Sequence, residues 1–195
     1  MMAQNDNNGD EALNEFLTRG AKYYPDVCQL KNEFQKHIKR IQKEIFVEYL
    51  PDQDLPAALA EKMPKNRDDS NFNYRDANEP TNNKGCIRTD FKLYGNKKLH
   101  FCLHWEREEG KEYTASILYK IKNASLDVEI SEQSYKSFNI RQGEDPYAHT
   151  GQEAPWAFFI DIDFEEHNPF NFRTAYEALA DHFVDNIAKK LELNK

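Results

Sequence analysis

Three carboxylates near the C-terminal end occupy every second position of one run: Asp161, Asp163 and Glu165 are separated by apolar residues. On a strand these side chains share one face, about 7 Å apart. Oxygen ligands at that spacing suit a hard cation such as Mg²⁺ or Ca²⁺. Three like charges in a row also repel, so a metal ion, basic side chains of an adjacent strand or a partner must lie nearby.

Cross-strand ion pairing is the simplest of these explanations, because basic residues occupy the polar faces of the other predicted strands. These residues are Arg88, Lys92, Lys98, Lys120 and Lys122. We therefore expect no metal ion at the carboxylates. We expect no other cofactor either, because the chain has no phosphate-binding or dinucleotide-binding glycine motif.

His100 and His104 share one face of a second predicted strand. Four strand residues place them about 13 Å apart, too far to chelate one ion. His100 would become an acid or base if an adjacent strand supplied a carboxylate. This is the alternative function, a metal-dependent phosphodiesterase or nuclease that uses Asp90, Glu106, His100 and the carboxylates of 161–165.

Two long amphipathic helices must hold these strands in place, because apolar residues recur at spacings of three and four over 26–50 and 172–192. Proline ends the first helix near Pro51. The second begins at Asn168-Pro169 or at Asn171, and Thr174 with Glu177 forms a predicted capping box. Residues 1–10 are predicted to be a loose tail and 64–85 a long polar loop.

Alternating apolar residues predict strands over 87–93, 99–106, 113–121 and 155–166, and a shorter one after Asn123. Residues 131–155 are expected to be irregular. Each strand has one apolar face, so the two helices cover one side of the sheet and the other side stays polar and charged. The predicted core includes Ile41, Trp105, Phe158, Ile160 and Phe183. The fold class is α+β: one domain over 1–195, with a mostly antiparallel sheet of about five strands.

The net charge of −8 lies entirely in the C-terminal part of the chain. Residues 124–195 carry 14 acidic and 6 basic side chains, whereas residues 1–123 carry 20 of each. Such a surface repels phosphate backbones and attracts basic partners, so nucleic acid is not an expected partner. Three widely spaced cysteines and no long apolar run predict a cytoplasmic protein that does not enter membranes.

The favoured function is a non-enzymatic, acidic, cytoplasmic protein that binds a macromolecular partner, as inhibitors, immunity proteins and chaperones do. No catalytic signature supports an enzyme. The partner is expected to be a protein with a basic contact surface, and the oligomeric state is left open. The expected contact residues are Glu144, Asp145, Asp161, Asp163, Glu165 and Glu166.

Overall fold

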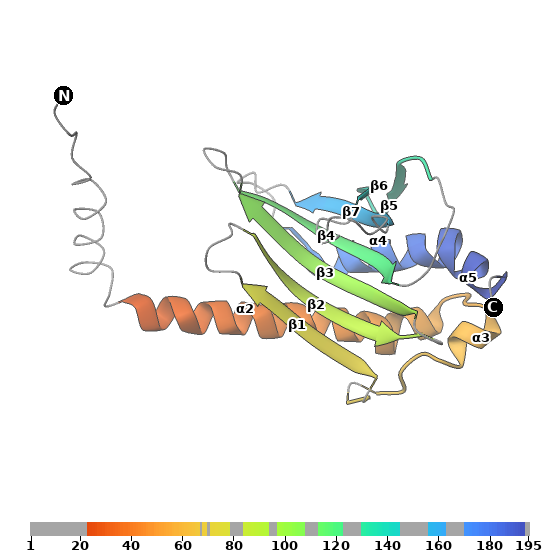
Figure 1. Ribbon diagram of the computed structural model, residues 1–195, viewed down its shortest axis with the longest axis horizontal. Coiled ribbons are helices and arrows are strands. Elements are labelled where there is room, and N and C mark those ends of the chain that lie inside the picture. The colour runs from red at the N-terminus through yellow and green to blue at the C-terminus, as the bar shows by residue number, and fades with distance from the viewer. Residues whose placement is uncertain are drawn as a thin grey trace, which may run out of the picture. The chain divides into compact units, whose positions relative to one another are not determined.

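The computed structural model describes residues 23–66, 68–69, 71–78, 84–93, 97–107, 113–122, 130–144, 156–162 and 170–193 (Figure 1). Backbone contacts divide the chain into two units, residues 1–37 and 38–195. The described part of the first unit is helical, and its apolar side chains Leu30 and Phe34, one turn apart, are exposed. The second unit holds the sheet and the remaining helices.

Each predicted long helix contains a π-helical turn. The helical segments are α2 (Tyr24–Glu44), η3 (Ile45–Tyr49), η4 (Leu50–Asp52), α3 (Ala57–Ala60), α4 (Phe172–Phe183), η5 (Val184–Ala188) and α5 (Lys189–Leu193). Asn171 caps α4, because its side chain accepts a hydrogen bond from the Thr174 backbone N–H at 3.1 Å. The capping box at Thr174 was wrong, and the start at Asn171 is confirmed.

The sheet has seven antiparallel strands in the order β1-β2-β3-β4-β7-β6-β5. Their bounds are β1 Phe72–Asn78, β2 Lys84–Lys92, β3 Lys98–Arg107, β4 Tyr113–Lys122, β5 Gln133–Tyr135, β6 Phe138–Glu144 and β7 Trp156–Ile162. Three of these strands lie where loops were predicted. β1 interrupts the polar stretch 64–85, and β5 and β6 lie within 131–155. The strand predicted after Asn123 and the tail 1–10 fall largely or wholly outside the described residues.

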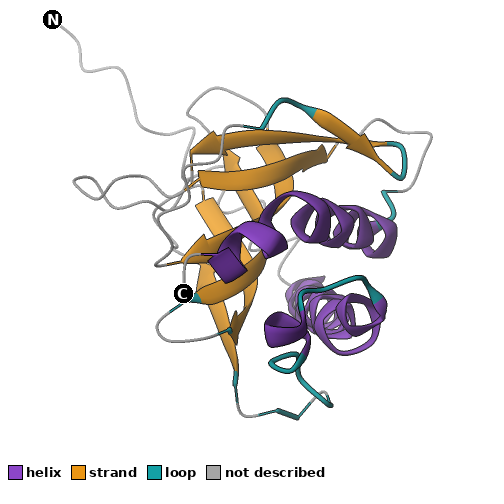
Figure 2. Ribbon diagram, turned by 90° about the vertical axis from the view of Figure 1, so that its right-hand side faces the viewer, coloured by secondary structure: helices purple, strands orange, loops and turns teal. Residues whose placement is uncertain are grey.

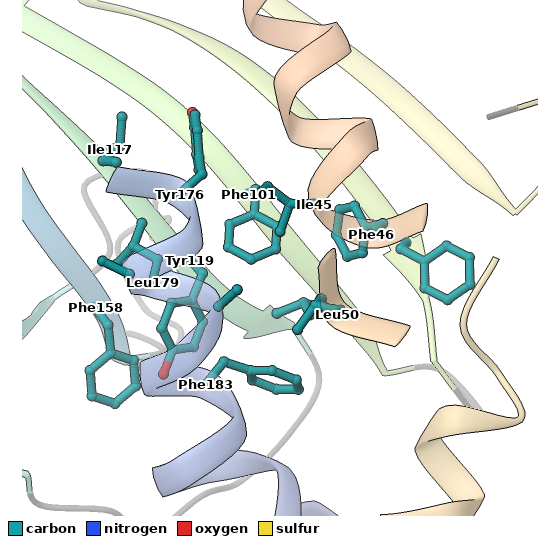
Figure 3. Close-up of a cluster of buried hydrophobic side chains, with 14 of the residues drawn as sticks. Ile45, Phe46, Leu50, Phe101, Ile117, Tyr119, Phe158, Tyr176, Leu179 and Phe183 are labelled. Atoms are coloured by element: carbon teal, nitrogen blue, oxygen red, sulfur yellow. The ribbon is translucent and has the colours of Figure 1, made fainter. Parts of the chain in front are cut away.

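Residues 38–52 and α4 cover one face of the sheet (Figure 2). Rings from both sides fill the space between the layers, including Phe46, Phe101 and Phe183 (Figure 3). Ile41, Phe158, Ile160 and Phe183 are buried as predicted. Trp105 is only half-buried: its ring lies against Gly85, directly opposite on β2, where a Cβ atom would clash with the indole.

Gln42 and Tyr119, two central polar side chains beneath the helices, form neutral hydrogen bonds. The Gln42 amide donates to the Tyr176 hydroxyl at 2.7 Å and to the Ile87 carbonyl at 3.1 Å, and its oxygen accepts from Thr89. Gln42 thereby joins α2 to β2 and α4. Further along, the Tyr119 hydroxyl lies 2.7 Å from His182 Nδ1. These bonds satisfy polar groups that would otherwise destabilise a dry core.

The second face of the sheet is also buried at its centre, although no described helix lies over it (Figure 2). Five side chains form a separate apolar cluster there: Cys86, Cys102, Leu118, Ala157 and Phe159. Asp90, His100, His104, Ser116 and Lys120 are buried on the same face. This side is polar and charged as predicted, but its centre is buried, and the prediction missed the apolar cluster that lies between the polar side chains. No helix in the described part of the chain is long and apolar enough to cross a bilayer.

Candidate functional site

Asp161 is the one described member of the predicted carboxylate row. Its side chain is 62% exposed and forms a bidentate ion pair with Arg141 of β6, with both N–O distances at 2.8 Å. The Arg141 guanidinium also lies 4.8 Å from the centre of the Phe159 ring. Ion pairing of this carboxylate is therefore observed, and Arg141, which supplies it, was not among the predicted basic partners. Arg141 was missed because it lies in the stretch taken as irregular.

Glu144, the last residue of β6, is exposed and lies directly opposite Trp156, the first residue of β7. Asp145, Asp163, Glu165 and Glu166 fall outside the described residues. The described ends to which they attach are well separated. Asp145 follows Glu144 at the start of β7, and Asp163 follows Ile162 at its end, about 20 Å away for a seven-residue strand. The two acidic groups, Glu144 with Asp145 and Asp163 with Glu165 and Glu166, are thus joined to the described chain next to opposite ends of β7.

One contact agrees with the alternative, enzymatic hypothesis. Asp90 lies directly opposite His100 on the second face, with Asp90 Oδ1 3.3 Å from His100 Nδ1. Arg88 holds the same carboxylate: its Nη2 donates to Oδ2 at 3.1 Å, and its Nε lies 2.7 Å from Oδ1. Burial raises the pKa of Asp90 above its usual range, while Arg88 acts in the opposite direction. This is an acid–base pair that the sequence could not assign, because it did not show which strands adjoin.

The other members of the proposed enzymatic site do not converge on this pair. Glu106 lies six residues from His100 along β3, about 20 Å away, and Asp161 lies three strands across and four residues along the sheet from Asp90, also about 20 Å away. No group of three His, Cys, Asp or Glu side chains in the described residues is arranged to hold a metal ion. Of the residues proposed for the enzymatic site, the described part of the chain brings only Asp90 and His100 together.

A polar cluster on the helix side was not found from the sequence. Lys136 Nζ lies 3.6 Å from Asp181 and 3.7 Å from Glu177, over the ring of Tyr49 at 5.2 Å. The Tyr49 hydroxyl donates to Asp181 at 2.8 Å. These contacts attach the β5–β6 turn to α4 and η3. They join residues more than 40 positions apart, so no local sequence pattern predicts them.

The turn itself has an uncommon backbone. Lys136 and Ser137 have φ values of 48° and 71°, the left-handed region in which two-residue hairpins favour Asn-Gly. On the other side of the hairpin, Asn186 of η5 donates to Gln133 and Tyr135, each at 3.1 Å. The contacts of Lys136 and Asn186 hold a conformation that the local sequence disfavours.

Comparisons of the chain with models of protein families, with curated proteins and with solved structures give no match.

Proposed function

We propose that this chain is a non-enzymatic cytoplasmic binding protein whose acidic C-terminal part docks onto a basic surface of a partner protein. The observation that carries this proposal is the charge distribution: 14 acidic against 6 basic side chains in residues 124–195, beside an even balance in residues 1–123. A surface of one sign accelerates encounter with a surface of the opposite sign.

Two structural observations support the proposal. Asp161 and Glu144 are both exposed on the C-terminal strands, where a partner can reach them. Among the described residues Asp90 contacts His100, but Glu106 and Asp161 lie far from this pair, and Asp90 and Asp161 each pair with an arginine. A hydrolytic metal site requires carboxylates that converge on one point.

The test begins with affinity capture from the native cell, followed by association rates of the purified partner across a salt series. We expect the association rate to fall as salt rises, because exposed charges are screened beyond about 8 Å at physiological ionic strength. Neutralising Glu144, Asp145, Glu165 and Glu166 together should slow association more than it changes dissociation. Since the two acidic groups attach at opposite ends of β7, each pair is also neutralised separately.

The matched control removes the same number of charges from exposed positions in the N-terminal part: Asp52, Asp54, Glu61 and Asp68. This variant should associate as the wild type does. An association rate that is independent of salt and unchanged in the C-terminal quadruple variant would contradict the proposal, and so would an equal loss in the control variant.

A further inference from the structure

Trp156 is an exposed aromatic residue beside an exposed carboxylate. Its side chain is 51% exposed at the start of β7 (Figure 1), and Glu144 lies directly opposite on β6. Opposite residues of an antiparallel pair have Cβ atoms about 5 Å apart on the same face of the sheet. The Trp156 indole and the Glu144 carboxylate are therefore attached to neighbouring positions of the sheet.

The same two strands show what such a pair can bind. On the other face, the Arg141 guanidinium lies over the Phe159 ring at 4.8 Å and forms two 2.8 Å hydrogen bonds with Asp161. A planar guanidinium can stack on a ring and pair with a carboxylate at once, which an ammonium group does less well. Phe159 and Asp161 thus form an arginine site that the chain fills with its own residue.

Other surface rings are also covered by cations of the chain. Lys43 lies 4.8 Å from the centre of the Tyr74 ring, and Lys136 lies 5.2 Å from that of Tyr49. In the described part of the chain no cation lies over Trp156, although tryptophan has the most favourable ring for this contact. The segment that joins Glu144 to Trp156, residues 145–155, adds two carboxylates and no lysine or arginine.

We propose that Trp156 and Glu144 form a docking point for an arginine side chain of the basic partner. The inference rests on the proposed function and names the residue type that the partner presents. The guanidinium stacks on the indole and pairs with the Glu144 carboxylate. Tryptophan and arginine are the residue types that most often carry the binding energy of protein interfaces, which suits a single anchor within a wider electrostatic contact.

The experiment uses two capped peptides of equal length and charge, one alternating glycine with arginine and the other glycine with lysine. Both are titrated into the full-length protein by calorimetry. We expect the arginine peptide to bind about fivefold more tightly than the lysine peptide. Trp156→Ala should abolish most of this preference, and Glu144→Gln should weaken the arginine peptide more than the lysine peptide.

Two further variants keep the result interpretable. Trp156→Leu retains apolar bulk without the ring, so it should lose the arginine preference as Trp156→Ala does. Tyr74→Ala removes an exposed ring on the opposite edge strand and should change neither affinity. Circular dichroism and thermal unfolding check that each variant is folded.

The outcomes separate this inference from the proposed function. If both peptides bind in a salt-dependent way but Trp156→Ala or Trp156→Leu leaves the arginine preference intact, the docking point is wrong and the acidic binding surface stands. If neither peptide binds to the wild type, both proposals fail together.

Discussion

The two faces of the sheet bury polar groups in different chemical states. Beneath the helices the central pairs are neutral: Gln42 bonds Thr89 and Tyr176, and Tyr119 bonds His182. On the second face the buried polar groups include ionisable ones in contact, with Asp90 between Arg88 and His100. Aromatic rings fill the helix-covered side, so an ion there would lose its hydration without a compensating partner. Where an ion is buried, a paired partner offsets that cost.

One ionisable group on each face has a shifted pKa. Burial lowers the pKa of His182 from 6.5 to about 4, with Asp185 acting in the opposite direction. Burial raises the pKa of Asp90, although Arg88 opposes the change. Both shifts favour the neutral form, as expected for groups removed from water. They nevertheless change stability in opposite directions with pH.

The largest expected effect compares the two apolar clusters. Ile160→Ala on the helix-covered face should lower the free energy of unfolding by about 2–5 kcal/mol, because it leaves a cavity between packed layers. Leu118→Ala on the second face should lower it by about 2 kcal/mol if that face is equally dry. Urea titration measures both. A loss below about half a kcal/mol for Leu118→Ala would show that the second face is open to water in solution.

The next largest effect is the loss of folding stability at acidic pH that the buried His182 causes. The unfolded chain takes up this proton near pH 6.5 and the folded chain only near pH 4, so the unfolded state binds more protons between these values. Stability should therefore fall as the pH is lowered from about 6.5 to 4, by about 3 kcal/mol in total. His182→Asn, which keeps a polar atom near Tyr119, should flatten the profile.

Asp90 should act in the opposite sense on the second face. Its raised pKa means that the folded chain binds the proton more tightly than the unfolded chain does. Stability therefore falls as the pH rises from the pKa of Asp90 in the unfolded chain to its higher pKa in the folded chain. Thermal unfolding from pH 4 to 7 compares His182→Asn with Asp90→Asn and with the exposed control His37→Asn. Equal pH profiles for wild type and His182→Asn would contradict the assignment of a neutral buried histidine.

The smallest effect concerns the ion pair of the second face. Arg88→Met should lower stability by about 1.5–3 kcal/mol, because it removes the charged hydrogen bond from Arg88 to the buried Asp90 carboxylate. Lys92→Met removes an exposed cation from the same strand and should change stability by less than half a kcal/mol. The double variant Arg88→Met with Asp90→Asn should recover part of the loss. If Arg88→Met lowers the free energy of unfolding no more than Lys92→Met does, the Arg88–Asp90 pair does not contribute to stability.

The sequence by itself determined the layers of this protein. The periods of 2 and 3.6 residues are local, so they predicted the central strands, both long helices and the burial of Ile41, Phe158, Ile160 and Phe183. They did not predict β1, β5 and β6, because those strands are short or polar and are stabilised by neighbours distant in sequence. Phe72, for example, is buried only because β1 pairs with β2 and brings it against Phe46.

Only the tertiary structure decided which side chains meet. The expected partner-binding residues could be placed on a strand face, but the pairing of Asp161 with Arg141 and of Glu144 with Trp156 depends on β6 lying beside β7. In the same way, Asp90 meets His100 through the β2–β3 register, and Lys136 meets Asp181 through the packing of a hairpin on α4. Strand order and register arise from contacts between distant segments. For that reason the amino-acid sequence identified the charged residues of this protein but not the residues that they contact.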